Sequence, residues 1–159
     1  MKIEMTRLSG WQKTILVVLR FAIGWHFFYQ GFGKIVSVGW SSGGYLSASW
    51  GPFLKIAENP TLLWLVDLST MWGLMILGIL LMVGLFTRFA AVMSAGLLLM
   101  IFAAIPPLDY TGFVYSTSQG SELYVDKTLI ELIALIVIAS FDTGRILGLD
   151  ILVRYWRAR

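Results

Sequence analysis

Residues 20–34, RFAIGWHFFYQGFGK, decide how the rest of the chain is interpreted, because they put four polar side chains inside a long apolar segment. An ionisable side chain at membrane depth costs about 2.5–3.5 kcal/mol on insertion scales. Such a side chain therefore usually faces protein or a wet cavity and has a partner there. On a helix that turns about 100° per residue, the polar side chains and two glycines share one face. The residues on this face are Arg20, Gly24, His26, Gln30, Gly31 and Lys34.

The composition is that of an integral membrane protein. Of the 159 residues, 58% are hydrophobic and 13% are charged, and the mean hydropathy is +0.80. A soluble domain has about 25% charged residues, and several runs here approach the roughly 20 apolar residues that cross a bilayer. The chain has no cysteine and one histidine, which excludes disulfides, cysteine-bound metal clusters and a bis-histidine haem within one chain. We expect no metal site.

The hydropathy pattern predicts an all-α, integral membrane four-helix bundle in a single domain covering residues 1–159. The predicted spans are about 14–36, 61–86, 88–105 and 124–141, the outer loops are 37–60 and 106–123, and a basic amphipathic tail covers 142–159. The very short turn between the second and third spans forces an antiparallel hairpin. Part of the first loop could lie as a short helix in the membrane interface, and the alternative is an ordered loop outside the membrane.

The distribution of Lys and Arg predicts that both termini are cytoplasmic. Three lie in the N-terminal tail, one in the short turn and four in the C-terminal tail, against three across the two opposite loops and their helix ends. This asymmetry follows the positive-inside rule. The net charge of +3 therefore reports orientation in the membrane, and we expect no nucleic-acid partner.

Ionisable side chains from three predicted helices reach the outer half of the bundle: Asp67 from the second helix, Lys127 and Glu131 from the fourth, and the polar face of the first. At 1.5 Å per residue, Arg20 and Glu131 differ in depth by about 6–9 Å, so Arg20 could pair with Glu131 or with Asp67. Such pairs can simply hold helices together, at about 0.6 kcal/mol each. A dense cluster in hydrocarbon can instead form a ligand or proton site. Both interpretations stay open at this point.

Four segments resemble the DoxX/DoxD family of small four-helix membrane proteins. Residues 19–35, LRFAIGWHFFYQGFGKI, resemble the family's first helix, and residues 72–91, WGLMILGILLMVGLFTRFAA, resemble its second helix and the turn that follows. Residues 125–135 and 143–150, VDKTLIELIAL and TGRILGLD, are similar to its fourth helix and tail. Where many relatives have Glu early in the second helix, this chain has Asp67. The long first loop with GYLSASWGPF, and the Pro-Pro after the third span, look closer to the DoxD branch, the small subunit of thiosulfate:quinone oxidoreductase.

The resemblance implies a quinone-interacting subunit of an oxidoreductase in the bacterial cytoplasmic (inner) membrane. Its pocket would open to the outer side, and electrons would come from an extracytoplasmic redox partner protein or a small reductant. A quinone site needs apolar walls and a few donors able to deliver protons. On this interpretation the candidate catalytic residues are Arg20, His26, Asp67 and Glu131. The candidate ligand-binding residues are Trp25, Gln30, Lys34, Trp72 and Lys127.

A second hypothesis is a non-enzymatic membrane protein whose outer polar cluster holds a partner or a ligand. A proton or anion pathway is a weaker alternative, because the cytoplasmic halves of the predicted spans offer no continuous polar route. We expect the lipid bilayer to surround such a chain. The Gly- and Ala-rich third span also offers a surface for a homodimer.

Overall fold

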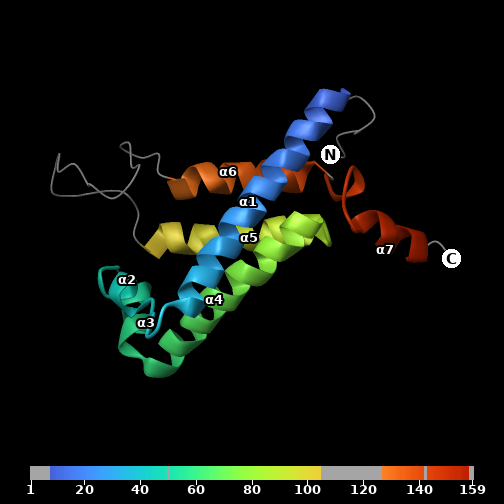
Figure 1. Cartoon of the computed structure of the whole chain (residues 1–159). Coiled ribbons are helices and arrows are strands. Elements are labelled where there is room, and N and C mark those ends of the chain that lie inside the picture. Colours follow the sequence, from blue (N-terminus) through green and yellow to red (C-terminus); the bar gives the residue numbers. More distant parts are fainter. Residues whose placement is uncertain (1–7, 50, 105–126, 142, 158–159) are drawn as a thin grey trace, which may run out of the picture.

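The computed structural model describes residues 8–49, 51–104, 127–141 and 143–157 (Figure 1). Helices are the regular secondary structure throughout these ranges, which contain no strand. In chain order the elements are α1 (Gly10–Val36), α2 (Gly43–Ser47), α3 (Pro52–Glu58), α4 (Pro60–Val83), α5 (Thr87–Ala104), α6 (Lys127–Ser140), the short 3₁₀ turn η2 (Thr143–Arg145) and α7 (Asp150–Arg157). The predicted all-helical architecture is confirmed for these residues.

Three helices in the described ranges, α1, α4 and α5, are long and apolar enough to cross a membrane. The prediction of a membrane protein with several apolar helices is therefore confirmed. The described part of α6 has 14 residues, and residues 124–126 of the predicted fourth span lie outside the described residues, as does the predicted loop 106–123. The fourth span and the side on which the termini lie stay predictions.

Local capping explains where α1 and α4 begin and end. The side chain of Ser9 accepts a hydrogen bond from the backbone of Gln12, while the side chain of Gln12 accepts one from the backbone of Ser9. This capping box starts α1 at Gly10, earlier than the predicted residue 14. At the other boundary Gly84 has φ = 71°, a left-handed conformation that glycine adopts without a steric penalty. α4 therefore ends at Val83, before the predicted residue 86.

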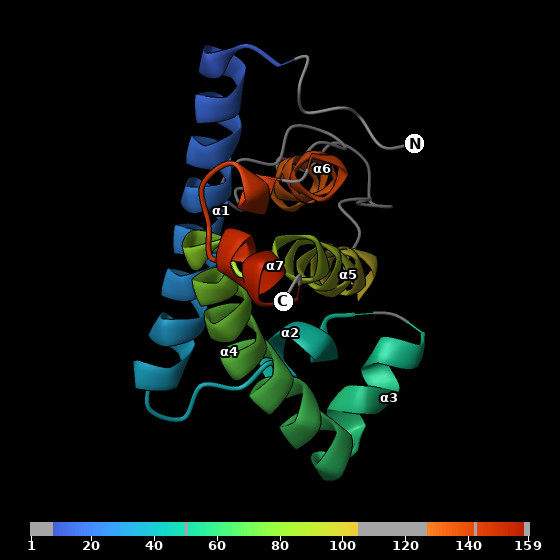
Figure 2. The ribbon, with the colours of Figure 1, turned by 90° about the vertical axis from the view of Figure 1, so that its right-hand side faces the viewer.

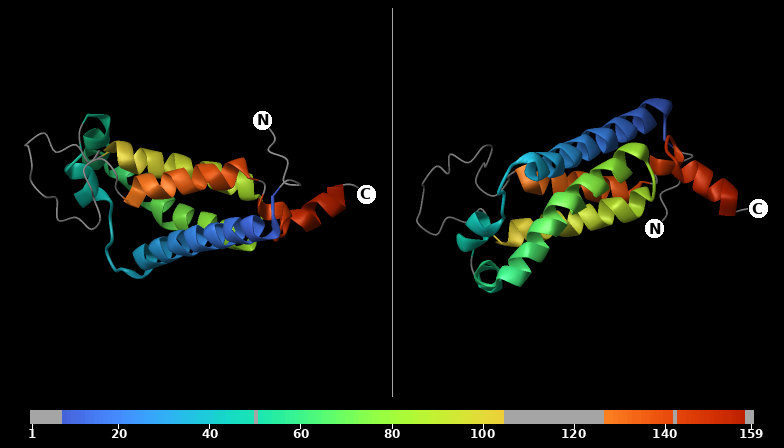
Figure 3. Two further views of the ribbon diagram at one scale, coloured as in Figure 1. Left: turned by 90° about the horizontal axis from the view of Figure 1, so that it is seen from above. Right: turned by 60° about the horizontal axis from the view of Figure 1, so that its bottom comes forward.

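The long helices pack as two antiparallel pairs, α1 with α4 and α5 with α6, and the pairs cross (Figures 1 and 2). Figure 3 shows the two ends of this bundle: α2 and α3 lie at one end, and α7 lies at the other. We call them the loop end and the α7 end. The core between the pairs consists of Phe27, Leu74, Leu81, Ala90, Ala91, Leu98, Leu135 and Ile138.

The outer faces of the helices are apolar and exposed, as expected of surfaces that contact lipid. Along α1 such side chains recur at Val18, Phe21, Trp25, Tyr29 and Phe32. The polar face deduced from the sequence lies on the opposite, protein-facing side, where Arg20, Gly24 and Gly31 are buried.

Glycines bring the backbones of α1 and α4 into direct contact. A Cβ atom added at Gly24 would lie 2.9 Å from the carbonyl oxygen of Gly78, and one at Gly31 would lie 2.5 Å from the backbone nitrogen of Met75. A Cβ at Gly78 would collide with the backbone of Phe28. Small residues at such positions allow the close packing that stabilises helix pairs in membranes. Gly78 therefore permits the close approach of α1 and α4, whereas Gly96 faces open space.

The α7 end is closed by the segment before α7, which folds onto the turn between α4 and α5. The backbone nitrogen of Asp150 donates to the carbonyl of Gly84 at 3.0 Å. The carboxylate of Asp150 accepts hydrogen bonds from the backbone nitrogens of Phe86, at 2.6 Å, and Thr87, at 3.1 Å. Asp150 therefore caps the N-terminus of α5 although it lies far away in the sequence. A helix N-terminus favours a negative charge beside it. Residues 72–91 and 143–150, two of the segments that resemble family motifs, thus contact each other.

We expect Gly78→Ala to lower the free energy of unfolding by about 1–3 kcal/mol, because the added methyl group forces α1 and α4 apart. The measurement is unfolding of the purified protein by SDS titration from mild detergent. Gly96→Ala is the matched control, since its Cβ would meet no atom within 4 Å, and it should cause no loss. Equal stability of the two variants would contradict the close contact.

We also expect Asp150→Ala to destabilise the protein by about 1 kcal/mol, the typical cost of losing a helix cap. The thermal unfolding midpoint in detergent measures this change. Glu58→Ala, which removes an exposed carboxylate at the end of α3, should leave the midpoint unchanged. An Asp150 variant as stable as wild type would argue against the cap.

Candidate functional site

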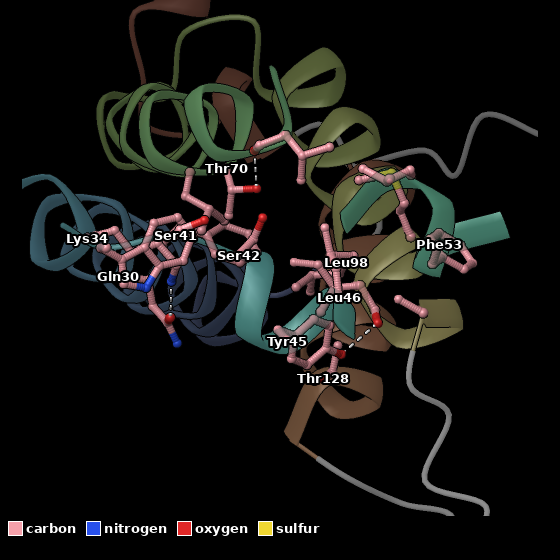
Figure 4. A pocket seen from close by; sticks show the side chains of 18 of the residues that line it. Gln30, Lys34, Ser41, Ser42, Tyr45, Leu46, Phe53, Thr70, Leu98 and Thr128 are labelled. Atoms are coloured by element: carbon pink, nitrogen blue, oxygen red, sulfur yellow. Dashed lines mark hydrogen bonds between the residues drawn. The ribbon is translucent and has the colours of Figure 1, made fainter. Parts of the chain in front are cut away.

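A pocket of about 430 Å³ lies at the loop end, bounded by the long helices and by α2 and α3 (Figure 4). Most of its wall is apolar, and polar groups are contributed mainly by α1, α6 and the segment that enters α2. The apolar lining residues are Phe27, Leu46, Phe53, Ile56, Val66, Leu74, Leu98, Met100, Ile101 and Ala104. The polar and aromatic lining residues are Gln30, Lys34, Trp40, Ser41, Ser42, Tyr45, Thr70, Lys127, Thr128 and Glu131.

The wall made by α2 is held in place by Asp67 of α4. The Asp67 carboxylate accepts hydrogen bonds from the Ser41 hydroxyl at 2.7 Å, the Ser42 backbone at 2.7 Å and the Ser42 hydroxyl at 2.5 Å. The hydroxyl of Tyr45 donates to the carbonyl of Ile101 at 2.9 Å, which ties α2 to α5 as well. Hydrogen bonds to a charged acceptor are among the stronger ones in proteins. In this structure Asp67 therefore anchors the loop beside the pocket, and its predicted proton exchange stays a prediction.

A chain of polar contacts runs along α1 and crosses to α6. Lys34 Nζ donates to Gln30 Oε1 at 3.1 Å, and Gln30 Nε2 lies 3.0 Å from His26 Nε2. The same His26 nitrogen lies 3.0 Å from Glu131 Oε1, and Lys127 Nζ lies 3.8 Å from that oxygen. The structure thus brings together five of the site residues proposed from the sequence. Figure 4 shows Lys34 and Gln30 side by side, joined by their hydrogen bond.

Lys34 also lies over an aromatic ring from the first loop. Its Nζ atom is 5.2 Å from the centroid of the Trp40 ring, within the range of a cation–π interaction. Because Lys34 and Trp40 both line the pocket, this contact sets an ammonium group and an aromatic face together at its polar wall.

Arg20 lies elsewhere, at the α7 end of the bundle. It is only 2% exposed, and its Nη2 atom donates to the carbonyl oxygen of Leu147 at 2.6 Å. The negative charge of Asp150 acts on it through space. The pairing considered from the sequence, with Asp67 or Glu131, is not what the structure has, because both carboxylates are engaged at the loop end. Arg20 instead joins α1 to the segment before α7, and it does not line the pocket.

The two tryptophans among the predicted ligand-binding residues also lie outside the pocket. Trp25 is 53% exposed and Trp72 is 46% exposed, on the outer surfaces of α1 and α4. The position of each tryptophan around its helix directs its side chain away from the interior. The aromatic walls come instead from Phe27, Trp40 and Tyr45, with Phe53 on α3.

The loop residues of the pocket were not proposed from the sequence. Serines 41 and 42, Tyr45 and Phe53 belong to a loop that the hydropathy pattern places outside the spans. The available signal was the density of aromatic and small residues in this loop, which is unusual for a plain linker. In the structure this loop contains two short helices, α2 and α3.

The family model described as DoxX matches residues 15–106, more than half of the chain. The chain belongs to the DoxX family. No curated protein matches the chain, and no solved structure matches it.

The DoxX match covers the pocket residues of α1, the first loop, α4 and α5, and it ends before α6. Lys127, Thr128 and Glu131, which complete the polar wall of this DoxX protein, therefore lie beyond the matched range. The resemblance found in residues 19–35 and 72–91 is confirmed at the level of the family.

We expect Asp67→Asn to loosen the loop between α1 and α4. The Asn side chain is uncharged, and one of its two polar atoms is a donor that cannot accept a hydrogen bond from the serines. A loss of about 1.4 kcal/mol in the stability of the anchored loop would raise the population of the open, cleavable loop tenfold. The rate of limited proteolysis follows that population. We therefore expect chymotrypsin to cleave this loop about tenfold faster. Glu58→Gln, the same acid-to-amide change at an exposed position of the loop, is the control. Equal cleavage rates would contradict the anchoring role.

Proposed function

We propose that this DoxX family protein is a membrane-embedded, quinone-interacting subunit of an oxidoreductase. The observation that carries the proposal is the pocket at the loop end, which joins a wide apolar wall to one polar wall. An apolar-tailed ligand with a few polar head atoms suits such a site. A bound quinone would serve there as the acceptor of two electrons and two protons, which would convert it to a quinol.

The side chains of the polar wall match what a quinone ring needs. Lys34 can donate a hydrogen bond from its ammonium group to a carbonyl oxygen, and the Thr128 hydroxyl can do the same from α6. Glu131 lies on the pocket wall and contacts His26 behind it, so it is the residue we assign to proton exchange. Trp40 and Tyr45 offer aromatic faces beside these groups.

The electrons come, in this proposal, from an extracytoplasmic redox partner protein or from a small reductant. The long aromatic first loop supports placement in the DoxD branch, the small subunit of thiosulfate:quinone oxidoreductase. The charge distribution supports cytoplasmic termini, and the apolar run over 124–141 supports a fourth span. Membership of the DoxX family supports the bacterial inner membrane. The pocket then opens toward the outer side, where the partner would dock.

Mass spectrometry of organic extracts tests the proposal. The protein is purified in mild detergent from bacterial membranes that contain quinone, and the extract is compared with that of the double variant Lys34→Met/Glu131→Gln. We expect wild type to retain quinone in near-stoichiometric amount and the variant to lose most of it, because the polar head loses its donors while the apolar wall remains.

The double variant Lys55→Met/Glu58→Gln is the matched control. It makes the same two chemical changes on α3, at exposed positions that do not line the pocket, and it should retain quinone as wild type does. If wild type carries only bulk lipid, the quinone proposal fails. The non-enzymatic binding or assembly protein then becomes the better hypothesis, and the proteins that co-purify with the loop end become the next object of study.

A further inference from the structure

We propose that Gln30 is a positioning residue, which decides whether the proton between His26 and Glu131 is attached to the carboxyl oxygen or to the imidazole nitrogen. We further propose that Lys34 sets the orientation of Gln30, so that a ligand in the pocket moves this proton. The link to a ligand rests on the proposed function, whereas the link between Lys34, Gln30 and His26 does not.

Lys34 fixes which way the Gln30 amide points. An ammonium group has donors and no acceptor, whereas an amide has a carbonyl oxygen that accepts and an NH₂ group that donates. The carbonyl oxygen Oε1 must therefore face Lys34, at 3.1 Å. The NH₂ group consequently faces His26, with its nitrogen 3.0 Å from Nε2.

The contacts at His26 Nε2 place opposite demands on this atom. An imidazole nitrogen either carries one hydrogen or presents one lone pair. Because the Gln30 NH₂ group donates to Nε2, that nitrogen presents its lone pair, and the hydrogen of the neutral ring is on Nδ1. Glu131 Oε1 lies 3.0 Å from the same lone pair, and an ionised oxygen would repel it there. The proton between the two atoms is therefore attached to Glu131 when Lys34 is in place.

The other arrangement moves one proton and changes no other covalent bond. The O–H bond of Glu131 breaks and the Nε2–H bond of His26 forms, so a neutral pair becomes an imidazolium–carboxylate ion pair. The new Nε2–H would then face the Gln30 NH₂ group, and the amide must turn to present its oxygen. Turning brings the NH₂ group against the Lys34 ammonium, which is unfavourable because both groups only donate. Lys34 thus opposes this arrangement until a ligand oxygen draws its ammonium away from Gln30.

The neighbouring charges are consistent with this coupling. Lys127 lies 3.8 Å from Glu131 Oε1 and its side chain is 54% exposed, so solvent weakens its preference for an ionised Glu131. The acidic residue of α4 near this site, Asp67, is engaged by Ser41 and Ser42. In α5 the described ionisable residue is Arg88, at the opposite end of the helix. Lys34 is therefore the charge that reaches the pair through a hydrogen-bonded neighbour.

Nitrogen-15 NMR of the histidine ring tests the proposal directly, because the sequence has a single histidine. The protein is labelled with ¹⁵N-histidine, purified with a histidine-free tag and placed in nanodiscs of quinone-free synthetic lipid. For wild type we expect Nε2 in the unprotonated range and Nδ1 in the protonated range. For Lys34→Met we expect the Nε2 resonance to move to the protonated range, because the amide is free to turn.

Two further variants separate coupling from general disturbance. Lys55→Met, the same change on α3, should leave the wild-type spectrum. In a Gln30→Met background, which has no amide to turn, adding Lys34→Met should produce no further shift of Nε2. A protonated Nε2 in wild type would overturn the proposal, and so would a Lys34→Met spectrum identical to wild type.

The NMR outcome is independent of the quinone test because no quinone is present. Adding a short-chain quinone to the wild-type nanodiscs then tests the link to the ligand. We expect the Nε2 resonance to move as it does in Lys34→Met. A resonance that stays in place at saturating quinone would contradict the ligand link and leave the Lys34–Gln30–His26 coupling intact.

Discussion

The cost of keeping polar side chains inside an apolar helix organises this protein. Four polar residues of α1, in a helix able to cross a membrane, face the interior and contact other polar groups there. His26, Gln30 and Lys34 form one connected set with Glu131 of α6. Arg20 is bound separately, through Nη2, to the carbonyl of Leu147. Such groups are stable at membrane depth only when paired. His26 pairs with Glu131 of α6 and Arg20 with the segment before α7, whereas Gln30 is bound by its neighbours on α1 itself. These requirements fix how α1 is rotated relative to its neighbours.

The polar face of α1 therefore serves both ends of the bundle. Arg20 and Lys34 are fourteen residues apart, which separates their backbones by about 21 Å along the axis. At the α7 end, Arg20 and Asp150 join the last part of the chain to α1 and to the start of α5. At the loop end, the same face supplies one wall of the pocket. Between them, Gly24 and Gly31 allow the backbone of α4 to pack directly on α1.

The first loop completes the site. Its serines are held by the carboxylate of Asp67, and its tyrosine is held by a backbone carbonyl of α5. The loop therefore contributes Trp40 and Tyr45 as walls from fixed positions. Function often depends on loops that a rigid scaffold positions, and here a single aspartate beside the pocket provides much of that positioning.

The membrane class, the approximate bounds of three spans and the polar face of α1 were determined by the sequence alone, because composition and helical periodicity are local properties. The family was also recognisable from short segments of this sequence. Only the tertiary structure decided which polar residues meet. Hydropathy does not encode how far each helix rotates about its axis, so it could not show that Trp25 and Trp72 face outward or that Arg20 meets Leu147. It also does not encode the path of a loop, and that path brings Ser41 and Ser42 to Asp67. The sequence therefore predicted which side chains need partners, and long-range packing selected the partners.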